Sequence, residues 1–313
     1  MAERLTHADG IVGFELASAD GTPLPAFEPG AHVDVHLPDG AIRQYSLYDA
    51  DAIDGLYRIA VLRDPAGRGG SAWLHDRVAV GDVLVISPPK NRFALDHSAA
   101  RSLLFAGGIG ITPLLSMAAR LHALGETFEV HYRTRSRRHT AFADCLIDGP
   151  LAPHAHVYHD DDPSHTFDLK RILCDGAREI HLYVCGPQGF MDAVTHAARQ
   201  RGWLNEQIHF EYFAAPATVA AVVNRGGFEL AIASSGQVIH VEPQQSVVDA
   251  LAGIGVSVPT SCKHGICGTC LVKVLDGEVD HKDFYLTPAE QQRNDLMLAC
   301  CSRAKSKRLV LDL

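Results

Sequence analysis

TSCKHGICGTC, residues 260–270, places three cysteines in a C-x4-C-x2-C pattern. A fourth cysteine follows the third after 29 intervening residues, 271–299. This spacing is typical of the four thiolates that hold a plant-type 2Fe–2S cluster. Two glycines inside the loop allow positive φ angles, which let a short segment wrap a cluster and turn backbone N–H groups toward sulfur. The pattern therefore predicts a ferredoxin-like domain with the cluster ligands Cys262, Cys267, Cys270 and Cys300.

The alternative for these cysteines is a structural zinc site. Zinc sites usually combine two short C-x2–4-C pairs, whereas this chain has one such pair with a third cysteine five residues upstream. The spacing therefore favours the cluster. Cys300 is followed directly by Cys301, and the spacing favours Cys300 as the fourth ligand.

Composition narrows the class of protein. The 313 residues predict two or three domains, and 47% hydrophobic residues are ordinary for a globular chain. The net charge of −9 argues against nucleic acid as a general partner. No apolar run approaches the ~20 residues of a membrane span, and we expect neither a membrane anchor nor a secretory leader. Eight cysteines then indicate a reducing compartment, which predicts a cytoplasmic protein.

Residue patterns divide the chain into three blocks, which predicts a multidomain protein. Residues 1–97 contain short β-prone runs between Pro and Gly turns, which predicts an antiparallel β-barrel. Residues 98–213 alternate strand and helix patterns, which predicts an α/β domain with a doubly wound parallel sheet. Residues 214–227 are typical of a linker. Residues 228–313 combine hairpin signals, a helix and the cysteine loop, which predicts an α+β ferredoxin domain of the β-grasp type.

Two turns of the second block suit a nucleotide. Gly107-Gly108-Ile109-Gly110 follows a predicted strand, and we expect Thr112 to cap the next helix with Pro113 at its first position. Backbone N–H groups there can meet a pyrophosphate. The turn lacks the full G-x-G-x-x-G fingerprint, so a plain strand–helix turn is the alternative. Cys185-Gly186-Pro187 ends a strand at the edge where open α/β folds bind ligands, and its thiol either contacts a nicotinamide or is simply buried.

Two segments of the first block carry residue types that bind phosphates. Arg43-Gln44-Tyr45-Ser46 puts a guanidinium, an aromatic ring and a hydroxyl on one strand. Arg68-Gly69-Gly70-Ser71 precedes a short predicted helix and offers N–H groups. Taken alone, the first segment fits a surface strand of mixed polarity better, and the second fits an ordinary turn equally well.

Together the motifs resemble those of the phthalate dioxygenase reductase family. RQYSL, GRGGS, AGGIGITP, YVCGP, HFEYF and SCKHGICGTC…CSRAKS occur in this order. The resemblance covers essentially the whole chain and extends to the reductase component of vanillate demethylase and similar Rieske oxygenase systems. It implies a barrel that binds FMN, a central domain that binds NADH and a C-terminal domain that holds the 2Fe–2S cluster.

The resemblance also implies roles for individual residues. The implied FMN contacts are Arg43, Gln44, Tyr45, Ser46, Ala60, Val61, Leu62, Gly69, Gly70, Ser71 and Phe213. The implied contacts of the nicotinamide nucleotide are Gly107, Gly108, Gly110, Thr112, Cys185, Gly186 and Pro187. Among these, Cys185 and Thr112 are the catalytic positions.

One departure from the family bears on the coenzyme. Where the phthalate enzyme has an acidic residue after an arginine, this chain reads Arg135-Ser136-Arg137-Arg138. An acid there favours the free 2′-hydroxyl of NADH, whereas arginines accept a 2′-phosphate. We expect NADH, with Arg135 at the coenzyme and NADPH as the alternative.

The three predicted sites belong together chemically. A nicotinamide gives up two electrons as hydride, an iron–sulfur cluster accepts one electron at a time, and a flavin connects the two. The predicted function is therefore an NADH-dependent reductase that passes electrons through FMN and the cluster to a separate terminal oxygenase of Rieske type. The alternatives are a reductase for a P450 or another acceptor, and a flavin and iron–sulfur redox sensor.

Overall fold

The computed structural model describes residues 1–49, 55–173, 179–213 and 226–313. The chain divides into two compact units, Met1–Phe213 and Ala214–Leu313. The predicted linker, 214–227, lies outside the described residues except for its last two glycines. The predicted boundary after residue 97 falls inside the first unit and stays a prediction.

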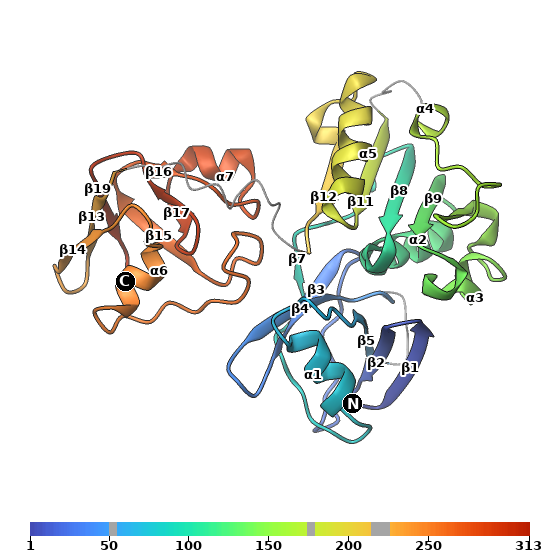
Figure 1. Cartoon of the computed structure of the whole chain (residues 1–313), viewed down its shortest axis with the longest axis horizontal. Helices are drawn as coiled ribbons and strands as arrows, with labels where there is room; N and C mark the ends of the chain where they lie inside the picture. The colour runs from blue at the N-terminus through green and yellow to red at the C-terminus, as the bar shows by residue number, and fades with distance from the viewer. Residues whose placement is uncertain (50–54, 174–178, 214–225) are drawn as a thin grey trace. The chain divides into compact units, whose positions relative to one another are not determined.

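The N-terminal part of the first unit is an antiparallel barrel, as predicted (Figure 1). One sheet has the strand order β1-β2-β5, a second has the order β4-β3-β6 with β7 also on β3, and a bridge between Leu47 and Ile59 joins them. The strands are β1 (Glu3–Ala8), β2 (Ile11–Leu16), β3 (Ala31–His36), β4 (Ile42–Ser46), β5 (Tyr57–Leu62), β6 (Val85–Ile86) and β7 (Lys90–Asn91). Helix α1 (Gly70–Arg77) packs Leu74 into the barrel core against residues such as Phe14 and Val33.

The rest of the first unit is a parallel sheet with the order β10-β9-β8-β11-β12, also as predicted. The strands are β8 (Arg101–Gly107), β9 (Phe128–Thr134), β10 (Ala155–His159), β11 (Ile180–Cys185) and β12 (Ile208–Glu211). The helices are α2 (Ile111–Leu124), α3 (Ala143–Leu146), α4 (Leu169–Ile172) and α5 (Gln188–Gln200), and the 3-10 turns are η1 (Gly108–Gly110), η2 (Arg137–His139), η3 (Ala152–His154) and η4 (Asn205–Gln207). Helices α2 and α5 contribute to two different cores of this domain. The strand order reverses between β8 and β11, and ligands bind beyond the carboxyl ends of strands at such a point.

Helix α2 begins earlier than predicted. It starts at Ile111, so Thr112 and Pro113 lie inside its first turn, and the expectation that Thr112 caps the helix was wrong. The physical reason is that the glycines before it already form a 3-10 turn, which continues into the helix without an extended cap residue. The Thr112 hydroxyl instead donates to the carbonyl of Ile109, at 3.1 Å. Gly125 ends the helix with a φ of 68°.

Two turns of the parallel sheet meet backbone to backbone because glycines lack side chains. A Cβ atom on Gly110 would overlap the backbone carbonyl group of Cys185 and would lie 2.7 Å from the backbone nitrogen of Gly186. A Cβ on Gly186, whose φ is 157°, would lie 2.9 Å from the backbone of Gly107. The turn after β8 and the turn after β11 therefore hold each other in place.

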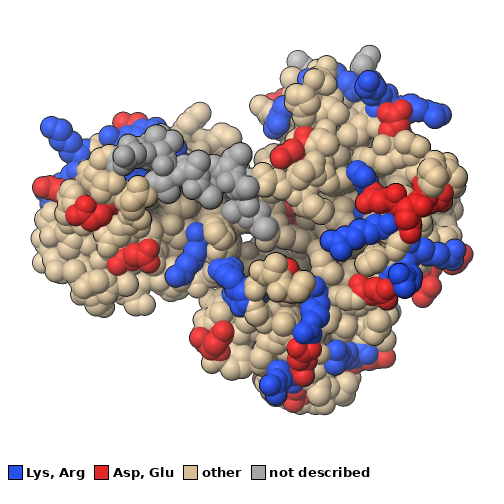
Figure 2. Space-filling view, viewed as in Figure 1, with Lys and Arg blue, Asp and Glu red and all other residues tan. Residues whose placement is uncertain are grey.

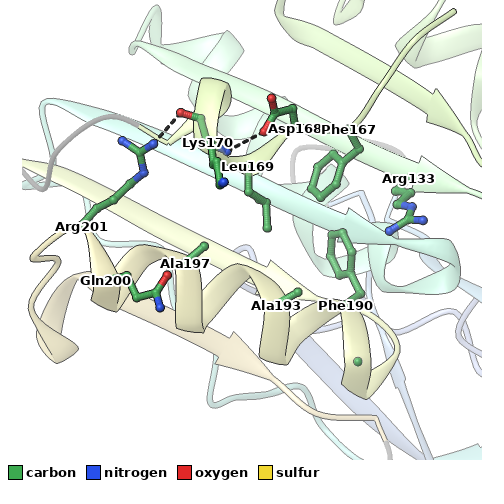
Figure 3. A pocket seen from close by; sticks show the side chains of 11 residues that line it. Arg133, Phe167, Asp168, Leu169, Lys170, Phe190, Ala193, Ala197, Gln200 and Arg201 are labelled. Atoms are coloured by element: carbon green, nitrogen blue, oxygen red, sulfur yellow. Dashed lines mark hydrogen bonds between the residues drawn. The ribbon is translucent and has the colours of Figure 1, made fainter. Parts of the chain in front are cut away.

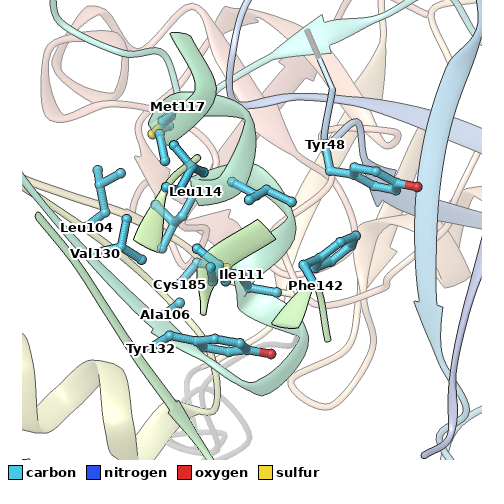
Figure 4. Close-up of a cluster of buried hydrophobic side chains, with 14 of the residues drawn as sticks. Tyr48, Leu104, Ala106, Ile111, Leu114, Met117, Val130, Tyr132, Phe142 and Cys185 are labelled. Carbon is cyan, nitrogen blue, oxygen red and sulfur yellow. The ribbon is translucent and has the colours of Figure 1, made fainter. Parts of the chain in front are cut away.

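One continuous core joins the barrel to the parallel sheet (Figure 4). Ile11, Tyr48, Ala60 and Phe93 of the barrel are buried in the same cluster as the apolar face of α2. The rings of Tyr48 and Phe142 have their centroids 4.8 Å apart. This burial fixes the barrel against the carboxyl edge of the sheet.

The second unit is a mixed sheet with two short helices, as expected for a ferredoxin domain. Its strand order is β14-β13-β19-β15-β17, with β16 and β18 as a separate pair. The elements are β13 (Phe228–Ile232), β14 (Val238–Val241), α6 (Val247–Ala252), β15 (Leu271–Asp276), β16 (Val279–Asp280), α7 (Pro288–Arg293), β17 (Leu296–Leu298), β18 (Arg303–Ala304) and β19 (Arg308–Leu311). A capping box begins α7, with reciprocal bonds between Thr287 and Glu290.

Within the described residues, no helix has both the length and the apolar character that crossing a membrane demands. Acidic and basic side chains are interspersed over the face shown in Figure 2. Many charged side chains form ion pairs, as Arg133 does with Asp160 and Lys90 with Asp34.

The contact between the two turns predicts the effect of a single methyl group. We expect Gly110→Ala to lower the free energy of unfolding of the first unit by about 2–3 kcal/mol, because the new Cβ overlaps backbone atoms that cannot move independently. Thermal unfolding followed by circular dichroism should show a midpoint roughly 5–10 °C lower. The control is Gly189→Ala, in the first turn of α5 with open space around it, which should unfold at the same temperature or slightly higher. Equal midpoints for the two variants would contradict the packing argument.

Candidate functional site

The predicted phosphate-binding residues of the barrel lie together. Arg43 donates from Nη2 to the carbonyl of Arg68, at 3.2 Å, and its side chain fills the space that a Cβ on Gly70 would need. Gly69 precedes α1 with a φ of 82° and, having no side chain, offers no cap to the N–H groups of the first turn. The Ser71 hydroxyl accepts from the N–H of Asp64, at 3.1 Å. A guanidinium beside a glycine-rich helix N-terminus fits a phosphate group.

Strand β4 presents its predicted flavin residues on two faces. Since side chains alternate along a strand, Arg43 and Tyr45 share one face while Gln44 and Ser46 share the other. Burial raises the pKa of Tyr45 to about 12, so its phenol stays neutral. The amide of Gln44 contacts His32 and Asp34 on the face of Ser46. A flavin contact by Gln44 stays a prediction.

The remaining predicted flavin residues differ in exposure. Ala60 and Val61 on β5 are buried, whereas Leu62 is 40% exposed. Phe213, two residues beyond β12, is 47% exposed. A half-exposed aromatic ring can stack on a planar ligand, so the predicted role of Phe213 agrees with its exposure.

Three polar groups from three strands meet where the barrel contacts the carboxyl edge of the sheet. Cys185 and Glu211 are register partners on β11 and β12, and Glu211 Oε2 lies 3.5 Å from the Oγ of Ser46 on β4. Burial raises the pKa of the Cys185 thiol well above its usual value, and the neighbouring Glu211 adds to this effect. Burial also raises the pKa of Glu211 to about 8, against a smaller opposing effect of the Ser46 hydrogen bond. At pH 7 both groups are therefore mostly protonated and neutral.

Glu211 is the residue that sequence reasoning missed. It lies in the motif HFEYF, which carried the family resemblance but suggested no role for the acid. The motif did contain a signal for such a role. A single acidic residue lies there between aromatic residues, on a strand that ends at the ligand-binding edge, and a carboxylate is rarely buried in such a place without a partner.

A pocket of about 680 Å³ lies on the α5 side of the sheet (Figure 3). Phe167 and Phe190 line it, with their ring centroids 5.6 Å apart, and the Arg133 guanidinium lies 5.8 Å from the ring centre of Phe167. Arg133 also donates to Asp160 Oδ1, at 2.6 Å. Aromatic rings with a guanidinium suit an adenosine group. Arg135 is exposed in the bend after β9 and does not line this pocket, so its coenzyme contact stays a prediction.

The four predicted cluster ligands converge in the second unit. The Cys300 thiol lies within hydrogen-bonding reach of the Cys262 and Cys270 thiols, and Cys262 likewise reaches Cys267. Backbone N–H groups of His264 and Ile266 point at the Cys262 sulfur, at 3.3 and 3.5 Å. Four thiols with N–H donors suit an anionic 2Fe–2S cluster. Among the described residues, no three His, Cys, Asp or Glu side chains are gathered tightly enough to share one ion, whereas a dinuclear cluster distributes its four thiolates over two irons.

A buried aspartate connects the two ligand-bearing segments. Asp283 accepts from the Ser302 hydroxyl at 3.2 Å, and its other oxygen accepts from the N–H of Leu286 at 2.8 Å. The next residue, Phe284, donates its N–H to the carbonyl of Gly265 in the cysteine loop, at 2.9 Å. Because Ser302 is two residues beyond Cys300, this network links the cysteine loop to the fourth ligand.

The fold and these sites define a class of protein: an oxidoreductase with a flavin barrel, a nucleotide-binding sheet and a 2Fe–2S domain. Residues 230–305 match the family model of the 2Fe-2S iron-sulfur cluster binding domain. Residues 85–208 match that of the dimethylamine monooxygenase subunit DmmA-like, N-terminal domain.

Relatives specify the family. The chain is 49% identical over 313 residues to the vanillate O-demethylase oxidoreductase of Pseudomonas sp. (strain HR199 / DSM 7063), covering 100% of this chain and 98% of that one. A solved structure of a phthalate dioxygenase reductase is 39% identical with a TM-score of 0.72, and the match covers 100% of this chain and 96% of that chain. An intact type IV self-sufficient cytochrome P450 monooxygenase is 36% identical with a TM-score of 0.92, covering 100% of this chain and 40% of that chain. The chain belongs to the phthalate dioxygenase reductase-like family, as the resemblance implied.

The arrangement of the cysteines predicts which of two adjacent thiols is a ligand. We expect Cys300→Ser to lose the visible absorbance and the low-temperature EPR signal of the reduced cluster, because it removes a converging thiolate. Cys301→Ser should keep both: the Cys301 thiol also lies within reach of that of Cys300, but it is directed toward the carbonyl of Leu298 and the hydroxyl of Ser302. Chemical analysis of iron and sulfide gives the number of clusters per chain in each of the two variants. A cluster lost in Cys301→Ser and kept in Cys300→Ser would reverse the assignment.

The Asp283 network predicts a second effect on the cluster. We expect Asp283→Asn to destabilise the second unit by about 1–3 kcal/mol, because an amide has one acceptor oxygen for the two donors, Leu286 N–H and Ser302 hydroxyl, and its nitrogen would face the other donor. The cluster should also be released faster when iron is chelated, which a stopped-flow or manual bleaching assay measures. Asp312→Asn, at an exposed ion pair with Lys273, is the control and should change stability by no more than about 1 kcal/mol. Identical release rates in the two variants would show that Asp283 does not hold the ligand segments together.

Proposed function

We propose that the protein is the reductase component of an oxygenase system. It takes two electrons from NADH and delivers them one at a time, through a flavin and a 2Fe–2S cluster, to a separate terminal oxygenase of Rieske type. One observation carries the proposal: a single chain contains three sites. They are Arg43 beside the N-terminus of α1, the packed glycine turns after β8 and β11, and four converging cysteines. Similarity over the whole length to a vanillate O-demethylase oxidoreductase supports it.

The residues of the chain bind and orient the reactants. A bound flavin supplies the conversion between hydride and single electrons. Arg43 and the N-terminus of α1 hold one phosphate group, which supports FMN as the flavin. Ser46 and Cys185 are placed at the meeting point of flavin and nicotinamide, and Glu211 holds a proton there at pH 7 on a carboxyl that Ser46 contacts. Neutral groups next to the nicotinamide avoid a buried charge that would have no partner.

The coenzyme pocket supports NADH. Phe167 and Phe190 offer aromatic faces to adenine, and the guanidinium of Arg133 is already engaged by Asp160. A carboxylate at this edge of a nucleotide-binding sheet favours a free 2′-hydroxyl over a 2′-phosphate. Arg135 is exposed nearby in sequence, and it is the residue through which NADPH would be accepted.

A second acceptor has a specific observation in its favour. The reductase-like part of a self-sufficient P450 monooxygenase matches the entire chain with a TM-score of 0.92. A separate P450 is therefore the alternative partner, and reconstitution with each kind of oxygenase decides between them. The cytoplasm is the proposed location, which the seven described cysteines support, since none forms a disulfide.

The order of electron transfer can be tested by removing one cluster ligand. We expect Cys262→Ser to keep at least half of the NADH-dependent reduction of a two-electron dye, because the flavin and nicotinamide sites lie in the first unit. Delivery of electrons to the one-electron acceptor cytochrome c or to a partner oxygenase should fall at least tenfold. Cys145→Ser, which changes a thiol in the first unit, is the control and should support both activities.

Parallel loss of both activities in Cys262→Ser would reject the order proposed. A redox sensor would instead show little steady-state dye reduction in the unaltered protein. A visible spectrum of the purified protein with overlapping flavin and iron–sulfur bands, bleached by NADH, is the first observation that the proposal requires.

A further inference from the structure

A line of polar side chains runs along β3 and β4 to the carboxyl of Glu211. His32 and Asp34 on β3 are the register partners of Ser46 and Gln44 on β4, so all four lie on one face of this pair of strands. The amide nitrogen of Gln44 lies 2.9 Å from Asp34 Oδ1 and 3.0 Å from His32 Nε2. At the outer end, Lys90 Nζ pairs with Asp34 Oδ2 at 2.6 Å. The sequence did not predict these contacts between the two strands; the family resemblance implied instead that Gln44 contacts FMN.

The chemistry of these groups fixes which nitrogen of His32 carries the proton. An aspartate paired with a lysine can only accept, so Gln44 must turn its NH2 group toward Asp34. The same NH2 group faces His32 Nε2, and this nitrogen must therefore be the acceptor. Burial lowers the pKa of His32 to about 4, so the ring is neutral at pH 7. The single ring proton consequently resides on Nδ1.

The Nδ1–H of His32 faces Glu211. The Nδ1 atom is buried and has no hydrogen-bond partner among the residues that the structure describes, and its distance to Glu211 Oε1 is 4.0 Å. The side chains of His32 and Glu211 are only 9% and 15% exposed. A buried donor without a partner is costly, and catalytic hydrogen bonds are often long in proteins without ligands and tighten when the site is filled.

We propose that His32 is a positioning residue: held in one tautomer by Gln44, it aims Nδ1–H at Glu211 Oε1 and fixes that carboxyl between itself and Ser46. The proposal rests on the placement of Glu211 in the proposed flavin–nicotinamide site. Each oxygen of Glu211 then faces one polar group, Oε1 the Nδ1–H of His32 and Oε2 the hydroxyl of Ser46, while Cys185 lies beside the carboxyl. The carboxyl is thereby held in a single orientation toward the reactants.

The arrangement sets how readily Glu211 loses its proton. The groups that face Glu211 are His32 from β3, Ser46 from β4 and Cys185 from β11. The charges that act on His32 are those of Asp34, Lys90 and Arg92. Since a donor stabilises the ionised form of a carboxyl, the His32 Nδ1–H lowers the pKa of Glu211, against the upward effect of burial. Removing that donor should move the ionisation of Glu211 to higher pH.

Two substitutions of His32 distinguish the roles of its two ring nitrogens. Asparagine places an amide group close to the position of Nδ1 and can still donate toward Glu211. Glutamine places its amide close to the position of Nε2, where it meets Gln44 but leaves Glu211 without its donor. Both variants lose the imidazole ring, so any effect of losing the ring itself is common to the two.

The experiment is an infrared pH titration of the purified holoprotein, in which Glu211→Gln identifies the carboxyl band of Glu211. We expect His32→Gln to move the midpoint of that band up by about one pH unit, the scale of a hydrogen bond to a charged group. His32→Asn should titrate close to the unaltered protein. The pH profile of flavin reduction by NADH, measured by stopped flow, should shift in the same way. Equal midpoints in His32→Gln and His32→Asn would overturn the proposal.

A second measurement keeps the proposal testable if a variant does not fold. Nitrogen-15 NMR of histidine in the unaltered protein reports which ring nitrogen of His32 bears hydrogen, with His32→Asn providing the assignment. We expect the Nδ1–H form, and an Nε2–H form would overturn the proposal. Neither spectroscopic result needs turnover, so a protein that shows them but reduces no dye with NADH loses the proposed function and keeps the role of His32.

Discussion

The site depends on one close approach, that of the glycine turn after β8 to the turn after β11. In an open parallel sheet, ligands bind beyond the carboxyl ends of the strands, where these two turns lie. The absence of a side chain at Gly110 lets α2 begin directly against the backbone of Cys185 and Gly186. Helix α2 then supplies Ile111 to the core that also buries Tyr48 of the barrel. The position of the barrel, and with it the distance from Ser46 to Glu211, follows from this backbone contact.

The amount that the sequence predicts depends on how local the determining interaction is. The cysteine spacing and the strand–helix alternation are local patterns. The family model of the 2Fe-2S domain agrees with the domain that the first predicts, and the parallel sheet agrees with the second. Thr112 has the right chemistry for a cap, but the glycine turn before it already adopts a 3-10 conformation, which propensity alone does not reveal. The partners Ser46 and Glu211 are 165 residues apart, so only the tertiary fold brings them together and buries the carboxyl.

The two units solve opposite electrostatic problems. At the carboxyl edge of the parallel sheet, where we propose that the nicotinamide binds, burial keeps the Cys185 thiol and the Glu211 carboxyl neutral, which avoids an uncompensated charge in a low dielectric. In the second unit the thiols must be ionised to bind iron, and an anionic cluster needs donors. The N–H groups of His264 and Ile266 provide them without adding a side-chain charge. Hydride transfer and single-electron transfer are therefore placed in environments of different polarity within one chain.

The cysteine loop, like the glycine turns of the parallel sheet, packs closely against a neighbouring segment because it has glycines at the points of contact. A Cβ on Gly265 would meet the backbone of Asp283 at 2.9 Å, and one on Gly268 would overlap the ring of Tyr285. Both glycines have positive φ angles, so the loop can turn its N–H groups inward while this neighbouring segment packs against its outer side. Through Asp283 and Ser302 the same segment restrains the fourth ligand. Outer contacts of this kind fix the orientation of metal ligands, and we expect them to hold the predicted cluster ligands in one geometry.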